Sequence, residues 1–162
     1  MTSKFFSKVL ESNAGITGFL LRLMVGPVFL SEGIQKFLRP DKIGAGRFEK
    51  MGFPDPETWA TLVASFEIGC GFLLLVGFLT RFAAVPIFVI MAVAIATTKI
   101  PILLGRDLGI FQVRSLDAYG FWSMAHEMRT DWAMLLGSLV LILIGAGKWS
   151  VDRRLSRTSD SG

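Results

Sequence analysis

The sequence has very few of the residues that usually build metal and redox centres. Its 162 residues include one cysteine, Cys70, and one histidine, His126. One thiol cannot form an internal disulfide or a redox-active cysteine pair, and one imidazole cannot provide two axial ligands to a haem. We therefore expect no metal site and no intrinsic redox cofactor, because such a centre would need ligands from a second chain.

Charged residues are also scarce, and they are unevenly distributed. Asp, Glu, Lys and Arg make up 19% of the chain and hydrophobic residues 52%, whereas charged residues are roughly a quarter of ordinary soluble domains. The charges lie at the two ends and in two loops, with long apolar runs between them. This layout predicts an integral membrane protein whose partner is the lipid bilayer. Basic residues flank the first and last runs, which favours lipid headgroups over nucleic acid as their partner.

Four apolar segments are candidates for membrane-spanning helices, since a span needs about 20 residues. They cover residues 16–38, 59–79, 82–104 and 130–147. We expect an all-α integral membrane bundle of four transmembrane helices over residues 14–155, after an N-terminal segment 1–13 and before a disordered tail 156–162. Thr80 and Arg81 alone separate the second and third segments, so these two must form an antiparallel hairpin. Basic residues clustered after the last segment favour a cytoplasmic location for both termini.

Charged residues within the apolar segments are the candidates for function, because a charge inside a membrane usually faces the bundle interior. Glu67 lies in the middle of the second segment. Arg22, Gly26, Gly33 and Lys36 share one face of the first segment, and glycines there would let another helix approach closely. Packing this face on the second helix would place Glu67 between Arg22 and Lys36.

The polar residues gather in the half of the bundle away from the termini. Counting about 1.5 Å per residue places Lys99 and Asp131 at one depth, with His126 and Glu127 just outside the fourth helix. We expect these groups to line one cavity, in which Glu67 handles protons. The expected ligand-binding residues are Arg22, Glu32, Gln35, Lys36, Lys99, His126 and Glu127.

Each candidate also has a structural interpretation. Glu67 could equally form an ion pair or hydrogen bond that fixes helix packing, and Arg22 more often plays such a role. Lys36 and Lys99 lie near helix ends and could extend to the membrane interface. His126 could simply be an exposed loop residue.

Four stretches of the chain resemble the DoxX family of small four-helix membrane proteins. They are LLRLMVGPVFLSEGIQKF in the first segment, RFEKMGFPDP in the next loop, FEIGCGFLLLVGFLTRFAA across the second segment and its turn, and GAGKWSVD near the C-terminal end. The resemblance implies a four-helix bundle in the bacterial inner membrane. It also implies redox work, since some relatives are subunits of thiosulfate:quinone oxidoreductase and others accompany oxidative or quinone stress responses. Glu32 departs from the pattern, because many members have a histidine there.

Three functions remain open at this point. The first is a quinone-interacting subunit of a membrane oxidoreductase or oxidative-stress complex, with quinone as ligand and electrons from a redox partner protein. The second is a non-catalytic membrane scaffold or assembly factor, in which Glu67 and Arg22 are structural. The third is a small-molecule carrier, which would need a homo-oligomer because four spans are few for a carrier.

Overall fold

The computed structural model describes residues 15–159, so the expected N-terminal segment 1–13 lies outside the described residues. Four long helical stretches account for most of the chain: α2 (Gly15–Leu38), α4 (Pro56–Val76), α5 (Thr80–Ala94) continued by the π-helical η1 (Ile95–Lys99) and by α6 (Ile100–Leu104), and α7 (Phe121–Ile144). Two shorter helices are α3 (Ala45–Lys50) and α8 (Val151–Ser159). No β-strand occurs within the described range, which confirms the all-α class.

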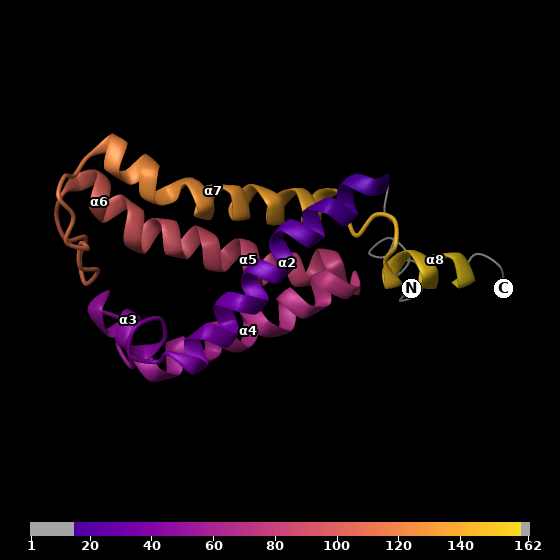
Figure 1. The fold of residues 1–162 in the computed structure, drawn as a ribbon, viewed down its shortest axis with the longest axis horizontal. Helices are drawn as coiled ribbons and strands as arrows, with labels where there is room; N and C mark the ends of the chain where they lie inside the picture. The colour runs from indigo at the N-terminus through magenta and orange to yellow at the C-terminus, as the bar shows by residue number, and fades with distance from the viewer. Residues whose placement is uncertain (1–14, 160–162) are drawn as a thin grey trace.

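The long helices form two pairs, α2 with α4 and α5–α6 with α7 (Figure 1). Near the start of α2 and the end of α7 the two pairs meet around a core that includes Val25, Leu74, Ala84, Ile87 and Leu141. Toward α3 the two pairs diverge (Figure 1). We call this second region the loop end, because residues 39–55 and 105–120 connect the helices there.

Glycines bring α2 and α4 into close contact. A Cβ atom added at Gly33 would lie 2.8 Å from the Ala64 carbonyl oxygen, and one added at Gly71 would lie 2.7 Å from the Leu30 nitrogen. Since real Cβ atoms do not approach other atoms this closely, the glycines permit the crossing. The predicted packing of the glycine face of α2 on the Glu67 face of α4 is therefore confirmed.

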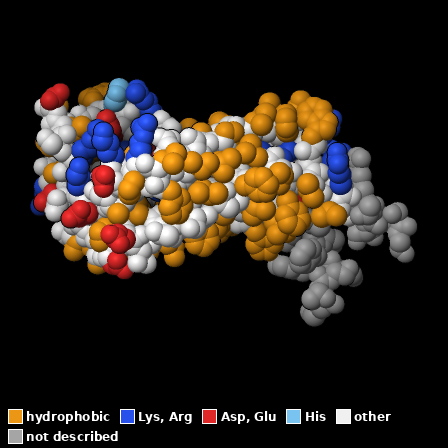
Figure 2. All heavy atoms as spheres, turned by 60° about the horizontal axis from the view of Figure 1, so that its bottom comes forward, with side chains coloured by type: hydrophobic (Ala, Val, Ile, Leu, Met, Phe, Trp, Pro, Cys, Tyr) orange, Lys and Arg blue, Asp and Glu red, His pale blue; other side chains and the backbone are white. Residues whose placement is uncertain are grey.

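Three of the four long stretches are long and apolar enough to cross a membrane: Gly15–Leu38, Pro56–Val76 and Thr80–Leu104. Hydrophobic side chains cover the middle of the molecule, and charged side chains gather toward its ends, mostly at the loop end (Figure 2). The fourth stretch, α7, is as long as α2, but each 18-residue stretch of it contains Glu127, Arg129 and Asp131. The expected count of four spanning helices is therefore not confirmed, because only three of the described helices qualify by length and composition.

Two boundaries differ from the expected ones. The last long helix begins at Phe121 rather than at residue 130, so His126 and Glu127 lie inside α7 and not beyond it. Residues 121–129 mix apolar and polar side chains and contain good helix formers and neither glycine nor proline, so the helix extends beyond the apolar run that hydropathy detects. Likewise α8 continues to Ser159, so residues 156–159 are helical where a disordered tail was expected.

Candidate functional site

A cavity of about 600 Å³ lies between the two helix pairs at the loop end. Most of its lining is apolar: Phe29 from α2, Leu62 and Phe66 from α4, and Val89 and Met91 from α5. Phe48, Met51 and Phe53, from α3 and the segment after it, also line it. Leu62, Phe66 and Val89 are each about half exposed, so the lining continues onto the apolar outer surface of α4 and α5.

One wall of the cavity carries a buried ion pair between α2 and α4. The Lys36 Nζ atom lies 2.6 Å from Oε2 of Glu67, and their side chains are only 7% and 4% exposed. Glu32, one turn before Lys36, approaches the same ammonium group at 4.0 Å and is half exposed. Helical periodicity produces this arrangement, because Lys36 and Gly33 share the face of α2 that meets α4. All three charged side chains line the cavity.

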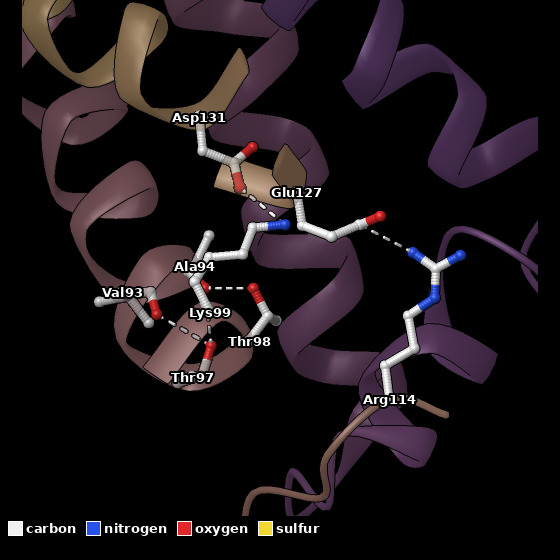
Figure 3. Close-up of polar contacts among 8 residues, drawn as sticks. All are labelled: Val93, Ala94, Thr97, Thr98, Lys99, Arg114, Glu127 and Asp131. Atoms are coloured by element: carbon white, nitrogen blue, oxygen red, sulfur yellow. Dashed lines mark hydrogen bonds and ion pairs between the residues drawn. The ribbon is translucent and has the colours of Figure 1, made fainter. Parts of the chain in front are cut away.

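The opposite helix pair contributes a second polar wall, built around η1 (Figure 3). Lys99 ends η1 and forms an ion pair with Asp131 of α7, with 3.0 Å between Nζ and Oδ2. The hydroxyl of Thr97 donates to the Val93 carbonyl at 2.8 Å, and that of Thr98 donates to the Ala94 carbonyl at 2.6 Å. Thr97, Thr98 and Asp131 line the cavity. Single π-helical turns inside α-helices are frequent at functional sites.

Several predicted ligand-binding residues lie away from the cavity. Gln35 donates to Ser31 on an exposed face of α2. His126 is exposed and contacts Arg129 through its Nδ1 atom at 3.2 Å. Glu127 forms an ion pair with Arg114 at 3.3 Å, beside the Lys99–Asp131 pair (Figure 3). None of these three side chains lines the cavity.

Arg22 is also remote from the cavity, and its role is structural. Its guanidinium is buried and donates to five main-chain carbonyls, at distances of 2.9 to 3.3 Å. The acceptors are Leu74 and Leu75 at the end of α4, and Ala146, Lys148 and Trp149 after α7. Arg22 therefore does not approach Glu67 from below as predicted. It instead binds carbonyls at the end of α4 and in the segment after α7, where the regular helical hydrogen bonding stops.

Asp152 complements Arg22 at the same end of the molecule. Its two carboxylate oxygens accept the N–H groups of Leu79 and Thr80, at 2.7 and 3.0 Å. These are the first free N–H groups of α5, and Leu79 has a φ of 49°, which leucine rarely adopts. We refer to Arg22, Asp152 and the main-chain groups that they bind as the clamp. The clamp gives the GAGKWSVD stretch a structural explanation that requires no chemical function.

The sequence prediction missed Arg47, Thr98 and Thr130, which line the cavity. Arg47 is exposed and makes no ion pair with any described residue. The only signal for Thr98 was its place in the polar run Thr97–Lys99 near the end of an apolar segment. Within residues 15–159, no group of three or more His, Cys, Asp or Glu residues is arranged to hold a metal ion.

The site therefore combines an apolar volume with two charged walls. Cavities of about 300–1,000 Å³ with a few convergent polar groups are typical small-molecule sites. Lys36 and Arg47 can donate hydrogen bonds to a ligand, while Glu32, Glu67 and Asp131 can accept them. A ligand with an apolar body and a compact polar group fits this arrangement.

Comparison with known proteins agrees with the architecture. The family model for DoxX matches residues 18–100, which run from the first turn of α2 to the first residue of α6. An uncharacterized membrane protein of Mycobacterium tuberculosis is 51% identical over 138 residues, covering 85% of this chain and 80% of that protein. No solved structure matches the chain. The match to the family model and the similarity to this membrane protein establish that the chain belongs to the DoxX family of membrane proteins.

Proposed function

We propose that this protein is an inner-membrane subunit that binds a quinone headgroup in the loop-end cavity and serves a membrane oxidoreductase or oxidative-stress complex. The observation that carries this proposal is the buried Lys36–Glu67 pair on the wall of an apolar cavity of about 600 Å³. A quinone has the matching chemistry, because its ring and tail are apolar and its carbonyl oxygens accept hydrogen bonds.

The residues of the first wall would divide the work of binding. Lys36 has three N–H donors, of which Glu67 takes one at short range, so it can also donate to a ligand oxygen. Arg47, without an ion-pair partner among the described residues, can donate to the same ligand. Glu67 would hold or release a proton beside the ligand, and the surrounding apolar side chains would exclude water.

Electron supply would come from a redox partner protein, because one cysteine and one histidine are too few for an intrinsic haem or thiol centre. A bound quinone would itself supply the two-electron redox chemistry. The chain's own contribution is thus a binding site with a proton-handling carboxylate.

The proposal includes a fourth crossing by α7 and a cytoplasmic position for the clamp. The charges that lower the hydropathy of α7 are partly neutralised, since Asp131 pairs with Lys99 and Glu127 pairs with Arg114. Four crossings bring the start of α2 and the end of α7 to one side, which agrees with the 2.6 Å hydrogen bond from the Lys148 N–H to the Gly15 carbonyl.

The test is the thermal stability of purified protein in detergent, with and without a soluble short-chain quinone. We expect the quinone to raise the Tm of the wild type. The Glu67→Gln variant should remain folded but should not show this rise. Glu127→Gln is the matched control, because it also breaks a carboxylate–cation pair but lies outside the cavity. Quenching of Trp59, which lines the cavity, gives an independent binding signal.

Two results would contradict the proposal. If the quinone leaves the wild-type Tm and the Trp59 signal unchanged, the cavity does not bind it. If Glu67→Gln melts early and neither protein responds to quinone, the pair serves helix packing, and the scaffold function is favoured.

A further inference from the structure

Three side chains of the second wall, Thr97, Thr98 and Asp131, can offer a ligand only hydrogen-bond acceptors. The Thr97 and Thr98 hydroxyls each donate to a carbonyl of the preceding turn, at 2.8 and 2.6 Å. A hydroxyl that donates internally still has a lone pair, so each of these oxygens can only accept from a ligand. In Asp131 the Oδ2 atom pairs with Lys99, while Oδ1 makes no hydrogen bond to any described residue. Figure 3 shows that second oxygen turned away from Lys99.

The first wall differs because it carries donors as well as acceptors. Lys36 and Arg47 carry N–H donors, and one of the acceptors beside them, Oε2 of Glu67, is already bound to Lys36. Both walls belong to one cavity, so a ligand that fills it meets donors from α2 and α3 and acceptors from η1 and α7.

A quinone leaves the acceptors of the second wall, Thr97, Thr98 and Asp131, without a donor. Its carbonyl oxygens accept from Lys36 or Arg47, but they have no proton to give to Thr98 or Asp131. A hydroquinone hydroxyl accepts and donates, so one headgroup can serve both walls. An acceptor buried by a ligand that cannot donate to it loses its contact with water without replacement.

We infer that the cavity selects a hydroxyl-bearing aromatic headgroup, the hydroquinone form of the ligand, through the acceptor wall formed by Thr98 and Asp131. This inference rests on the proposed function, whose ligand class it narrows. It assigns Thr98 and Asp131 as residues that determine specificity, and it involves no transfer of electrons.

The experiment compares three probes of similar size: a short-chain 1,4-hydroquinone, the corresponding quinone, and the hydroquinone dimethyl ether. The ether keeps two acceptor oxygens but has no donor. Dissociation constants come from Tm titrations under anaerobic conditions, with ascorbate added to the hydroquinone samples and to matched blanks. The proteins are wild type, Thr98→Val and Asp131→Asn, each first checked for folding without ligand.

Ser65→Ala is the control variant. Ser65 donates to the carbonyl four residues earlier at 2.8 Å, as Thr98 does, but it is exposed on α4 and does not line the cavity. Thr98→Val is the primary variant, because valine is nearly isosteric with threonine and leaves the Lys99–Asp131 pair intact.

For wild type we expect hydroquinone to bind at least about tenfold more tightly than either the quinone or the dimethyl ether. Thr98→Val should reduce that preference at least about threefold, Asp131→Asn should reduce it further, and Ser65→Ala should preserve it. Equal binding of the three probes to wild type, or an unchanged preference in a folded Thr98→Val protein, would overturn the inference.

The outcomes also separate this inference from the proposed function. Glu67-dependent quinone binding with no preference for hydroquinone would support the proposed function and refute the inference. Hydroquinone binding that depends on Thr98, without detectable quinone binding, would support the inference and refute the quinone ligand. No binding of any probe would refute both.

Discussion

Buried cations occur at both ends of the helix bundle, but their surroundings differ. At the clamp, Arg22 is 1% exposed and donates to main-chain carbonyls, and its opposite charge, Asp152, binds main-chain N–H groups. At the loop end, Lys36 is 8% exposed and binds the side chain of Glu67 beside a cavity. At the clamp the charged side chains bind main-chain groups, whereas at the loop end they pair with each other beside a cavity.

The difference teaches which buried charge is available for binding. The guanidinium of Arg22 has its donors occupied by five carbonyls, so it has little capacity left for a ligand. The ammonium of Lys36 has one short contact and lines the cavity. Burial alone therefore does not identify the functional charge in this protein. The nature of the partner, main chain or side chain, distinguishes the two roles.

The largest effect on stability is expected at the clamp. Arg22→Met should lower the free energy of unfolding by about 4 kcal/mol or more, because several buried carbonyls lose their donor together. Arg22→Lys should recover little, since an ammonium has three donors and cannot reach five carbonyls around a planar group. Unfolding in mixed detergent–SDS micelles measures both changes. A Lys variant as stable as the wild type would show that only the positive charge matters here.

Lys36 and Glu67, the ion pair at the loop end, should tolerate replacement by apolar residues together but not one at a time. Lys36→Met or Glu67→Leu alone should each cost about 3 kcal/mol, because a buried charge is left without its partner. The double variant should lie within about 1 kcal/mol of the wild type, because an apolar pair leaves no charge unpaired. The same unfolding assay completes this double-mutant cycle. Additive losses in the double variant would mean that the two residues have separate structural roles, as at the clamp.

A smaller effect is expected for the carboxylate of the clamp. Asp152→Ala should cost about 2 kcal/mol, because two N–H groups at the start of α5 lose an acidic cap. Asp152→Asn should cost roughly half as much, since the amide oxygen can still accept one of them. Chemical unfolding of the two variants checks the order. Equal losses would show that the charge, rather than the hydrogen bonds, carries the effect.

Helical periodicity explains why part of the loop end was predictable. The spacing of Gly33 and Lys36 defines a face of α2, and that face does meet Glu67. Counting residues from the helix ends also placed Lys99 and Asp131 at one depth, where they pair. Both predictions required only regular helical geometry and the assumption that the helices cross the same membrane.

The clamp and the second wall could not be predicted in this way. The partners of Arg22 are main-chain carbonyls, which every residue has, so no sequence pattern marks them. The π-helical turn changes the register of Thr98 by hydrogen bonding that composition does not reveal. His126 and Glu127 were misplaced because hydropathy locates the apolar core of a helix and not its first residue.

The smallest change in stability, and the clearest separation of the two ends, is expected from Val89→Phe. Val89 lines the cavity and is 51% exposed, so the larger ring can enter the cavity without disturbing the packed core. We expect the free energy of unfolding to change by about 0.5 kcal/mol or less, as for most exposed substitutions. Quinone binding should weaken at least about tenfold, because the ring occupies volume that the ligand needs. Val76→Phe is the matched control, since Val76 is 37% exposed near the clamp and away from the cavity. Tm titrations measure both variants, and comparable losses of binding in the two would place the ligand outside the loop-end cavity.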